Sequence, residues 1–366
     1  MDEVKLTQEL VRINSENPPG NEKEIAKFIR DYLDDLKIPV KLIKFDRNRF
    51  NVIASLGKGD GLMLAGHTDT VPTGDPKNWK FNPFGGKIVD DKIYGRGSTD
   101  MKSGLAAILT AVKKFKKEKF KKRLALAFVG DEEVAMTGTK YLIKNKKDFL
   151  KDIKYGVMAE STNMKLRIAQ KGITMIKLRF RGKAAHGSWP AGGVNAILKA
   201  SDFIQQTKLL SKKLKKKKDL LLSSGTINVG KISGGVKVNM VPDYCEVEID
   251  RRLIPGETPQ IAIKQYKNIL KKLKLKAEIE FLNEPRLSMK ISKKSKIVKM
   301  IQSIIKTNAV GQLGYTESEL FFRECDIDFV SCGPGKFAHI TNEYVKISQI
   351  KKAVKLYENL IKRWCL

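Results

Sequence analysis

Residues 62–70 read LMLAGHTDT, an apolar run that ends in a histidine and an aspartate. The run is short and bounded by glycine, which is typical of a strand buried in a parallel sheet. His67 and Asp69 therefore stand at the carboxyl end of a predicted strand, where open α/β sheets bind their ligands. Taken alone, this cluster could equally well be a polar turn. Whether it forms a binding site has to be judged from the rest of the chain.

The flanking sequence repeats the same alternation of strand and helix. Further buried strands are expected at residues 50–56 and 124–130. Amphipathic helices are expected over residues 3–14, 21–36, 103–117 and 137–148. Strands that alternate with helices predict an α/β layered domain with a mostly parallel sheet.

The pattern changes near residue 172. Strands are expected at residues 173–181, 222–231, 237–253 and 276–281, with helices at 193–210 and 258–273. The order β-α-β-β-α-β is that of a ferredoxin-like motif. A chain of 366 residues also suggests about two domains. We expect residues 172–284 to form a second domain, inserted into a first domain of residues 1–171 and 285–366.

The chain is strongly basic, with 71 Lys and Arg against 40 Asp and Glu and a formal charge of +31. Such an excess can indicate a nucleic acid or an anionic membrane as partner. Here it consists mostly of scattered lysines, and no aromatic residues interleave with its densest run, residues 212–218. We therefore expect a solvated surface and neither nucleic acid nor membrane as partner.

The four cysteines include no C-x-x-C pair, which favours reduced thiols and a cytoplasmic protein. The N-terminus has no signal-peptide pattern, and no run of 18 apolar residues occurs.

The chain contains only three histidines, His67, His186 and His339. Each follows a strand-like run or lies in a turn rich in glycine and proline. A single histidine is more often structural than functional. Three histidines in polar turns, two of which can meet carboxylates, favour metal binding, because neutral imidazole is the commonest protein ligand for metals.

Acidic residues stand in three comparable turns. Asp100 lies in GRGSTDMKSG at residues 95–104, which lacks the spacing of a phosphate loop and could also be a helix cap. Glu132 and Glu133 belong to GDEE at residues 130–133, where adjacent acids repel one another unless a cation neutralises them. Glu160 ends another predicted strand.

Two histidines and three acids can thus converge from five loops: His67, Asp100, Glu133, Glu160 and His339. Nitrogen and oxygen ligands without thiolate suit Zn²⁺ best, with Co²⁺ or Mn²⁺ as alternatives. Two such ions that share a carboxylate can activate a water molecule for hydrolysis.

These motifs together resemble the di-zinc deacylases and exopeptidases, the family of acetylornithine deacetylase, succinyl-diaminopimelate desuccinylase and glutamate carboxypeptidase. The likeness covers nearly the whole chain, from SENPPGNE at residues 15–22 to the Ala-His and Glu-Tyr-Val segments near residues 338–345. It implies a zinc-exopeptidase-like layered fold for the first domain, which would be the catalytic metal-binding domain. It also implies that residues 172–284 are a lid and dimerisation domain, and that the protein binds two divalent metal ions. His67 and Glu160 would bind one ion, Glu133 and His339 the other, and Asp100 would bridge them.

The resemblance also implies the roles of the remaining site residues. Glu132 would be the general base and Asp69 would orient His67. In the inserted domain, His186 in AAHGS at residues 184–188 would reach the active site of a dimer partner and stabilise the oxyanion. Asn239, Arg252 and Gly335 would contact the substrate, with the Arg252 guanidinium binding a carboxylate.

Two segments depart from the family pattern. Glu160 stands in Ala-Glu-Ser-Thr where Gly-Glu-Pro is usual, and residues 314–317, Gly-Tyr-Thr-Glu, replace a Gly-Thr-Asp-Ala type of segment near the substrate.

The resemblance implies metal-dependent cleavage of the amide bond of N-acyl amino acids, in amino-acid biosynthesis. The alternatives are an aminopeptidase, dipeptidase or carboxypeptidase on the same scaffold, a basic nucleic-acid-binding protein, and an inactive scaffold. The intact Glu132-Glu133 pair argues against the last.

Overall fold

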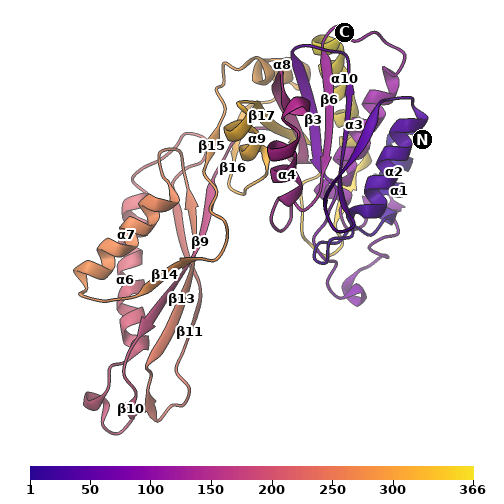
Figure 1. The fold of residues 1–366 in the computed structure, drawn as a ribbon. Helices are drawn as coiled ribbons and strands as arrows, with labels where there is room; N and C mark the ends of the chain where they lie inside the picture. The colour runs from indigo at the N-terminus through magenta and orange to yellow at the C-terminus, as the bar shows by residue number, and fades with distance from the viewer. The chain divides into compact units, whose positions relative to one another are not determined.

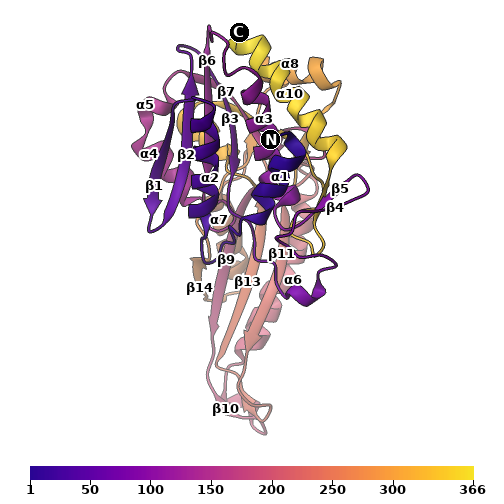
Figure 2. The ribbon, with the colours of Figure 1, turned by 90° about the vertical axis from the view of Figure 1, so that its right-hand side faces the viewer.

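The computed structural model describes residues 1–366, which form two compact units (Figures 1 and 2). The first unit comprises Met1–Ile168, Ile291–Val310 and Thr316–Leu366. The second unit comprises Ala169–Lys290 and Gly311–Tyr315. No helix in either unit is long and apolar enough to span a bilayer.

The first unit contains six neighbouring strands of a nine-stranded mixed sheet, in the order β1, β2, β6, β3, β7, β17. Their bounds are Val40–Asp46 for β1, Arg49–Leu56 for β2, Gly61–His67 for β3, Arg123–Val129 for β6, Ile153–Ser161 for β7 and Asp328–Gly333 for β17. The β6, β3, β7 and β17 neighbours are parallel, whereas β1, β2 and β6 pair antiparallel. The expected parallel pairing is confirmed in the centre of the sheet, but the pairing is antiparallel toward both edges, because β17 also pairs antiparallel with β8 (Leu166–Gln170). Every residue of β3 is buried, as its apolar sequence predicts.

Helices cover both faces of this sheet (Figure 1). On one face, α1 (Glu3–Arg12) and α10 (Ile347–Cys365) pack against α3 (Ser103–Lys114). On the other face lie α4 (Thr137–Asn145) and α9 (Ser318–Cys325). The unit is completed by α2 (Glu22–Asp35), α5 (Lys147–Leu150), α8 (Lys296–Ile305) and a small sheet of β4 (Lys87–Val89), β5 (Lys92–Tyr94) and β18 (Tyr344–Lys346).

A glycine near the start of α3 allows an unusually close approach to β7. A Cβ atom on Gly104 would lie 2.2 Å from the main-chain oxygen of Ala159, well inside van der Waals contact. The turn that carries Asp100 therefore lies directly beside the strand that carries Glu160.

The second unit has a four-stranded antiparallel sheet in the order β11, β13, β9, β14. The strands are β9 (Gly172–Arg181), β11 (Thr226–Gly234), β13 (Tyr244–Leu253) and β14 (Glu278–Phe281), and two helices complete the unit, α6 (Ala196–Leu214) and α7 (Pro259–Lys272). The predicted β-α-β-β-α-β order is confirmed. Phe180, Phe203 and Tyr266 lie in the core between sheet and helices.

One predicted strand of the second unit is divided in the structure. The segment expected at residues 237–253 consists of β12 (Met240–Val241) and β13, with Pro242 between them. Proline has no N–H to donate to a strand ladder, which explains the interruption. The short β12 pairs instead with β10 (Ala185–His186) and places His186 opposite Met240.

Candidate metal centre

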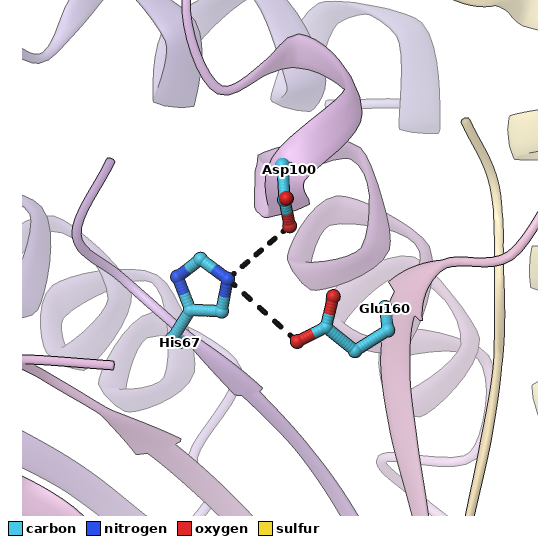
Figure 3. A group of neighbouring side chains, drawn as sticks. All are labelled: His67, Asp100 and Glu160. Carbon is cyan, nitrogen blue, oxygen red and sulfur yellow. Dashed lines mark hydrogen bonds and ion pairs between the residues drawn. The ribbon is translucent and has the colours of Figure 1, made fainter. Parts of the chain in front are cut away.

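His67 lies at the carboxyl end of β3 and is almost completely buried. Its Nε2 atom faces Asp100 Oδ1 at 3.3 Å and Glu160 Oε1 at 3.8 Å (Figure 3). Glu160 stands near the end of β7, the parallel neighbour of β3, so both side chains emerge at the same edge of the sheet. Asp100 joins them from the turn at Ser98–Lys102 that precedes α3.

Asp100 also faces a second histidine. Its other oxygen, Oδ2, lies 3.4 Å from Nε2 of His339, which follows β17. The same His339 atom is 3.0 Å from Oε1 of Glu133, in the loop after β6. The two oxygens of one carboxylate are therefore directed at two histidines, one at the end of β3 and the other in the loop after β17.

Three groups of potential ligands overlap at this position. They are His67 with Asp100 and Glu160; Asp100 with Glu133 and His339; and His67 with Glu132 and Glu133. Within each group the donor atoms lie within 4.8 Å of one another. The structure thus brings together all five residues that the sequence proposed as metal ligands, together with Glu132.

The electrostatics of the cluster favour bound cations. Burial raises the pKa of Glu160 to about 8, and the nearby charge of Asp100 adds to the effect. Burial likewise raises the pKa of Glu132 well above its ordinary value, although this side chain keeps some contact with solvent. Carboxylates that repel one another in a buried site are stabilised by divalent cations. The imidazole and carboxylate donors fit Zn²⁺, Co²⁺ or Mn²⁺.

Asp69 is connected to the cluster through the main chain. The ring atom Nδ1 of His67 lies 2.9 Å from the main-chain oxygen of Asp69 but 3.6 Å from its carboxylate, which is beyond hydrogen-bonding distance. That carboxylate accepts the main-chain N–H groups of Glu132 and Glu133, each at 3.1 Å. Asp69 is therefore placed to hold both glutamates of the loop after β6.

Gly335 also lies in the first unit, beside the Asp100 turn. A Cβ atom on Gly335 would lie 2.7 Å from the side chain of Thr99. Its N–H donates to Oε1 of Gln349 at 2.8 Å. The structure therefore shows Gly335 packed next to the cluster.

The other predicted residues lie in the second unit. His186 is exposed, and its Nδ1 accepts the N–H of Ser188 and contacts the Ser188 hydroxyl at 2.6 Å, which leaves Nε2 as the outward donor. The guanidinium of Arg252 pairs with Asp250 on the same strand through Nε at 2.9 Å and Nη2 at 3.0 Å. Asn239 is exposed, and its main-chain oxygen accepts the N–H of Gly187. The approach of these three residues to the metal centre stays a prediction.

Sequence reasoning did not single out several buried polar residues behind the cluster. Asn17 donates to the carboxylates of both Asp69 and Asp131 at 2.9 Å. Glu317 is fully buried, accepts a hydrogen bond from Thr139, and has a pKa raised to about 7 by burial. Asn17 belongs to the Asn-Pro-Pro-Gly segment that contributes to the family resemblance, and Glu317 to the departing segment 314–317. These two segments are the parts of the sequence that could have pointed to Asn17 and Glu317. Neither segment specifies the hydrogen-bond partners that the two side chains have in the structure.

Comparison with known proteins establishes the family. The chain matches the model of peptidase family M20/M25/M40 over residues 63–363 and belongs to this family. It is 30% identical to an acetylornithine deacetylase of Aliivibrio fischeri over 356 residues, which cover 94% of this chain and 92% of the relative. It is 28% identical to a probable succinyl-diaminopimelate desuccinylase of Staphylococcus aureus, and the alignment covers 98% of this chain and 96% of the relative.

A solved structure shows the same fold over the full length. The M20 family metallo-carboxypeptidase Sso-CP2 from Sulfolobus solfataricus superposes with a TM-score of 0.82 at 23% identity, covering 100% of this chain and 99% of that one. The chain is therefore a metallohydrolase of the M20 family that acts on amide or peptide bonds.

Substitution of Asp100 by Asn should reduce the metal content of the purified protein. The shared carboxylate loses its charge, and both ligand groups that contain it lose an anionic donor. Metal analysis of the dialysed protein measures the effect. Glu317→Gln is the matched control, because Glu317 is a fully buried acid outside the three ligand groups and should keep the wild-type metal content. Equal metal loss in both variants would contradict the assignment of Asp100.

Proposed function

We propose that this protein is a two-metal amidohydrolase that cleaves the amide bond of N-acyl amino acids. The observation that carries the proposal is the pair of ligand groups that share Asp100, with Glu132 beside them. The deacylase names of two relatives at 30% and 28% identity, aligned over nearly their whole length, support this substrate class. We further propose cytoplasmic location, a role in amino-acid biosynthesis, and no nucleic acid or membrane partner.

In this proposal His67 and Glu160 would hold one ion, Glu133 and His339 would hold the other, and Asp100 would be shared by both sites. Zinc fits the donors best, with cobalt or manganese as alternatives. When bound, two divalent ions supply a water of lowered pKa and positive charge for the developing oxyanion. The first unit is then the catalytic domain.

Glu132 is the general base of the proposed reaction. Its main-chain N–H is bound by Asp69, and its carboxylate lies within 4.8 Å of the donor atoms of His67 and Glu133. From there Glu132 accepts a proton from the attacking water and passes it to the nitrogen of the leaving amine. Asp69 positions Glu132 and, through its main-chain oxygen, the ring of His67.

The second unit is the proposed lid and dimerisation domain. His186 directs its Nε2–H outward and donates to the oxyanion in the active site of a partner chain, while Asn239, Arg252 and Gly335 contact the substrate. Strongly exposed apolar side chains in this unit support a protein partner: Trp189 is 68%, Val236 90% and Val238 101% exposed. A second copy of the chain is the partner that would place His186 in an active site.

A peptidase acting on the free termini of short peptides is the alternative, consistent with the family description. A substrate panel separates the two. The metal-loaded enzyme should hydrolyse N-acetyl or N-succinyl amino acids with a higher kcat/KM than any di- or tripeptide, measured by release of the free amine. Preference for a peptide would replace the deacylase proposal by the peptidase one, and hydrolysis of neither class would contradict both.

Substitution of Glu132 by Gln should lower kcat about 10²–10⁴-fold, the usual contribution of a general base. The two bound metals should remain, because Glu132 is not needed as a ligand in the proposed sites. Glu133→Gln is the control and should lose metal as well as activity. Full activity of Glu132→Gln, or metal loss from it, would show that the base has been assigned wrongly.

A mixing experiment tests whether His186 acts in the partner's active site. Glu132→Gln and His186→Ala chains should each be nearly inactive alone. Co-expressed, they should recover about a quarter of wild-type activity, because about half of randomly paired dimers are mixed and each mixed dimer has one intact site. Absence of recovery in a preparation that contains mixed dimers would place His186 in the active site of its own chain or outside it.

A further inference from the structure

Glu343 is a fully buried acid that binds the turn containing Asp100. Its Oε1 atom accepts the main-chain N–H groups of Thr99 at 2.8 Å and of Asp100 at 3.1 Å. Its Oε2 atom accepts a hydrogen bond from Nη1 of Arg96 at 2.6 Å. Glu343 thus contacts the main chain of the shared metal ligand without belonging to any of the ligand groups.

Arg96 extends this contact to two other ligand loops. Nη1 also donates to the main-chain oxygen of Ile340 at 3.3 Å, and Nη2 donates to that of Pro72 at 3.2 Å. Ile340 directly follows His339, and Pro72 lies in the loop that begins at His67. The guanidinium, 4% exposed and lying over the ring of Trp79, therefore joins three segments that each carry a proposed ligand.

Main-chain bonds align these segments independently of the ion pair. Tyr344 in β18 pairs with Tyr94 in β5, and the N–H of Gly95 donates to the main-chain oxygen of Glu343 at 3.0 Å. The Thr99 hydroxyl donates to the main-chain oxygen of Tyr344 at 2.6 Å. The small sheet already sets the register of these segments. The Arg96–Glu343 ion pair is therefore not needed for the register and can instead position the side chains near it.

We propose that Arg96 and Glu343 are positioning residues that hold the bridging carboxylate of Asp100 in line with His339. They determine the affinity of the second metal site, formed by Asp100, Glu133 and His339. This inference rests on the proposed two-metal function. Charge-assisted hydrogen bonds that main-chain N–H groups donate to a carboxylate are strong, and loss of one partner leaves a buried charge without compensation.

The first metal site should depend less on this pair. His67 is the last residue of β3 and Glu160 lies in β7, so the main sheet holds both through paired strands. His339, by contrast, lies in a loop, and its side chain is 50% exposed. Removal of the ion pair should therefore affect the two ions unequally.

The test is metal binding by purified full-length Glu343→Gln over a chelator-buffered series of free Zn²⁺. Partners that orient a metal ligand typically change metal affinity about 10–100-fold when mutated. We expect one of the two ions to bind about 10–100-fold more weakly and the other to keep its wild-type affinity. Unchanged affinity for both ions, or equal weakening of both, would overturn the inference.

The second unit offers a matched control. Arg251 and Glu257 form another buried Arg–Glu pair at 2.8 Å, remote in sequence from every proposed metal ligand. Glu257→Gln makes the same chemical change and should lower the unfolding temperature without changing either zinc affinity. If it weakens zinc binding as Glu343→Gln does, general destabilisation explains both, and the positioning role is refuted.

Arg96→Lys is the second variant, and it tests the proposal if Glu343→Gln does not fold. Lysine keeps the charge but cannot make the three contacts of the guanidinium. The same metal ion should therefore bind more weakly in this variant as well. A wild-type affinity for both ions in Arg96→Lys would count against the inference. The assay uses no substrate, so its outcomes are separable from the activity proposal. A wild-type chain that binds fewer than two metal ions would overturn the two-metal function itself. Variants that bind both ions with wild-type affinity would overturn only the positioning role.

Discussion

The parallel pairing of β3 with β6 and with β7 places three chain segments so that their carboxyl ends meet at one edge of the sheet. His67, the Glu132-Glu133 loop and Glu160 emerge there side by side. Acids brought this close in a buried position repel one another, and the raised pKa of Glu160 reports that repulsion together with the loss of solvation. Divalent cations would neutralise these acids, and the imidazole and carboxylate donor atoms fit such cations. The topology of the sheet thus creates the site that metallohydrolase chemistry requires.

A layer of main-chain hydrogen bonds surrounds the ligands and supports this arrangement. Asp69 binds the N–H groups of Glu132 and Glu133, and Glu343 binds those of Thr99 and Asp100. In both cases a buried carboxylate accepts the main-chain N–H groups of a segment that carries proposed metal ligands. Loops are usually the mobile parts of a fold. Carboxylates that bind their main chain give these loops the fixed geometry that a metal site requires.

Much of this could be predicted from local sequence because the local signals are physical. The apolar run before His67 can only be a buried strand or a short buried helix, and glycine at both ends favours the strand. The β-α-β-β-α-β order of the second unit followed from the alternation of strand and helix patterns. The strand pattern over residues 237–253 did not predict the division at Pro242, although proline has no N–H to donate to a strand ladder. The prediction of five metal ligands depended on the combined motifs and the family resemblance, since each cluster taken singly was compatible with a polar turn or a helix cap.

The fold class and the residues able to bind a metal could be predicted from the chain, because periodicity, glycine placement and residue chemistry are local properties. The hydrolase family was predicted from the resemblance of the combined motifs. The packed fold was needed to show which atoms meet: that the two oxygens of Asp100 face His67 and His339, that the main-chain oxygen of Asp69 contacts the His67 ring, and that Arg96 and Glu343 join three segments. Such contacts join residues up to 247 positions apart. Their partners are set by the packing of the whole unit, which no single segment of the chain encodes.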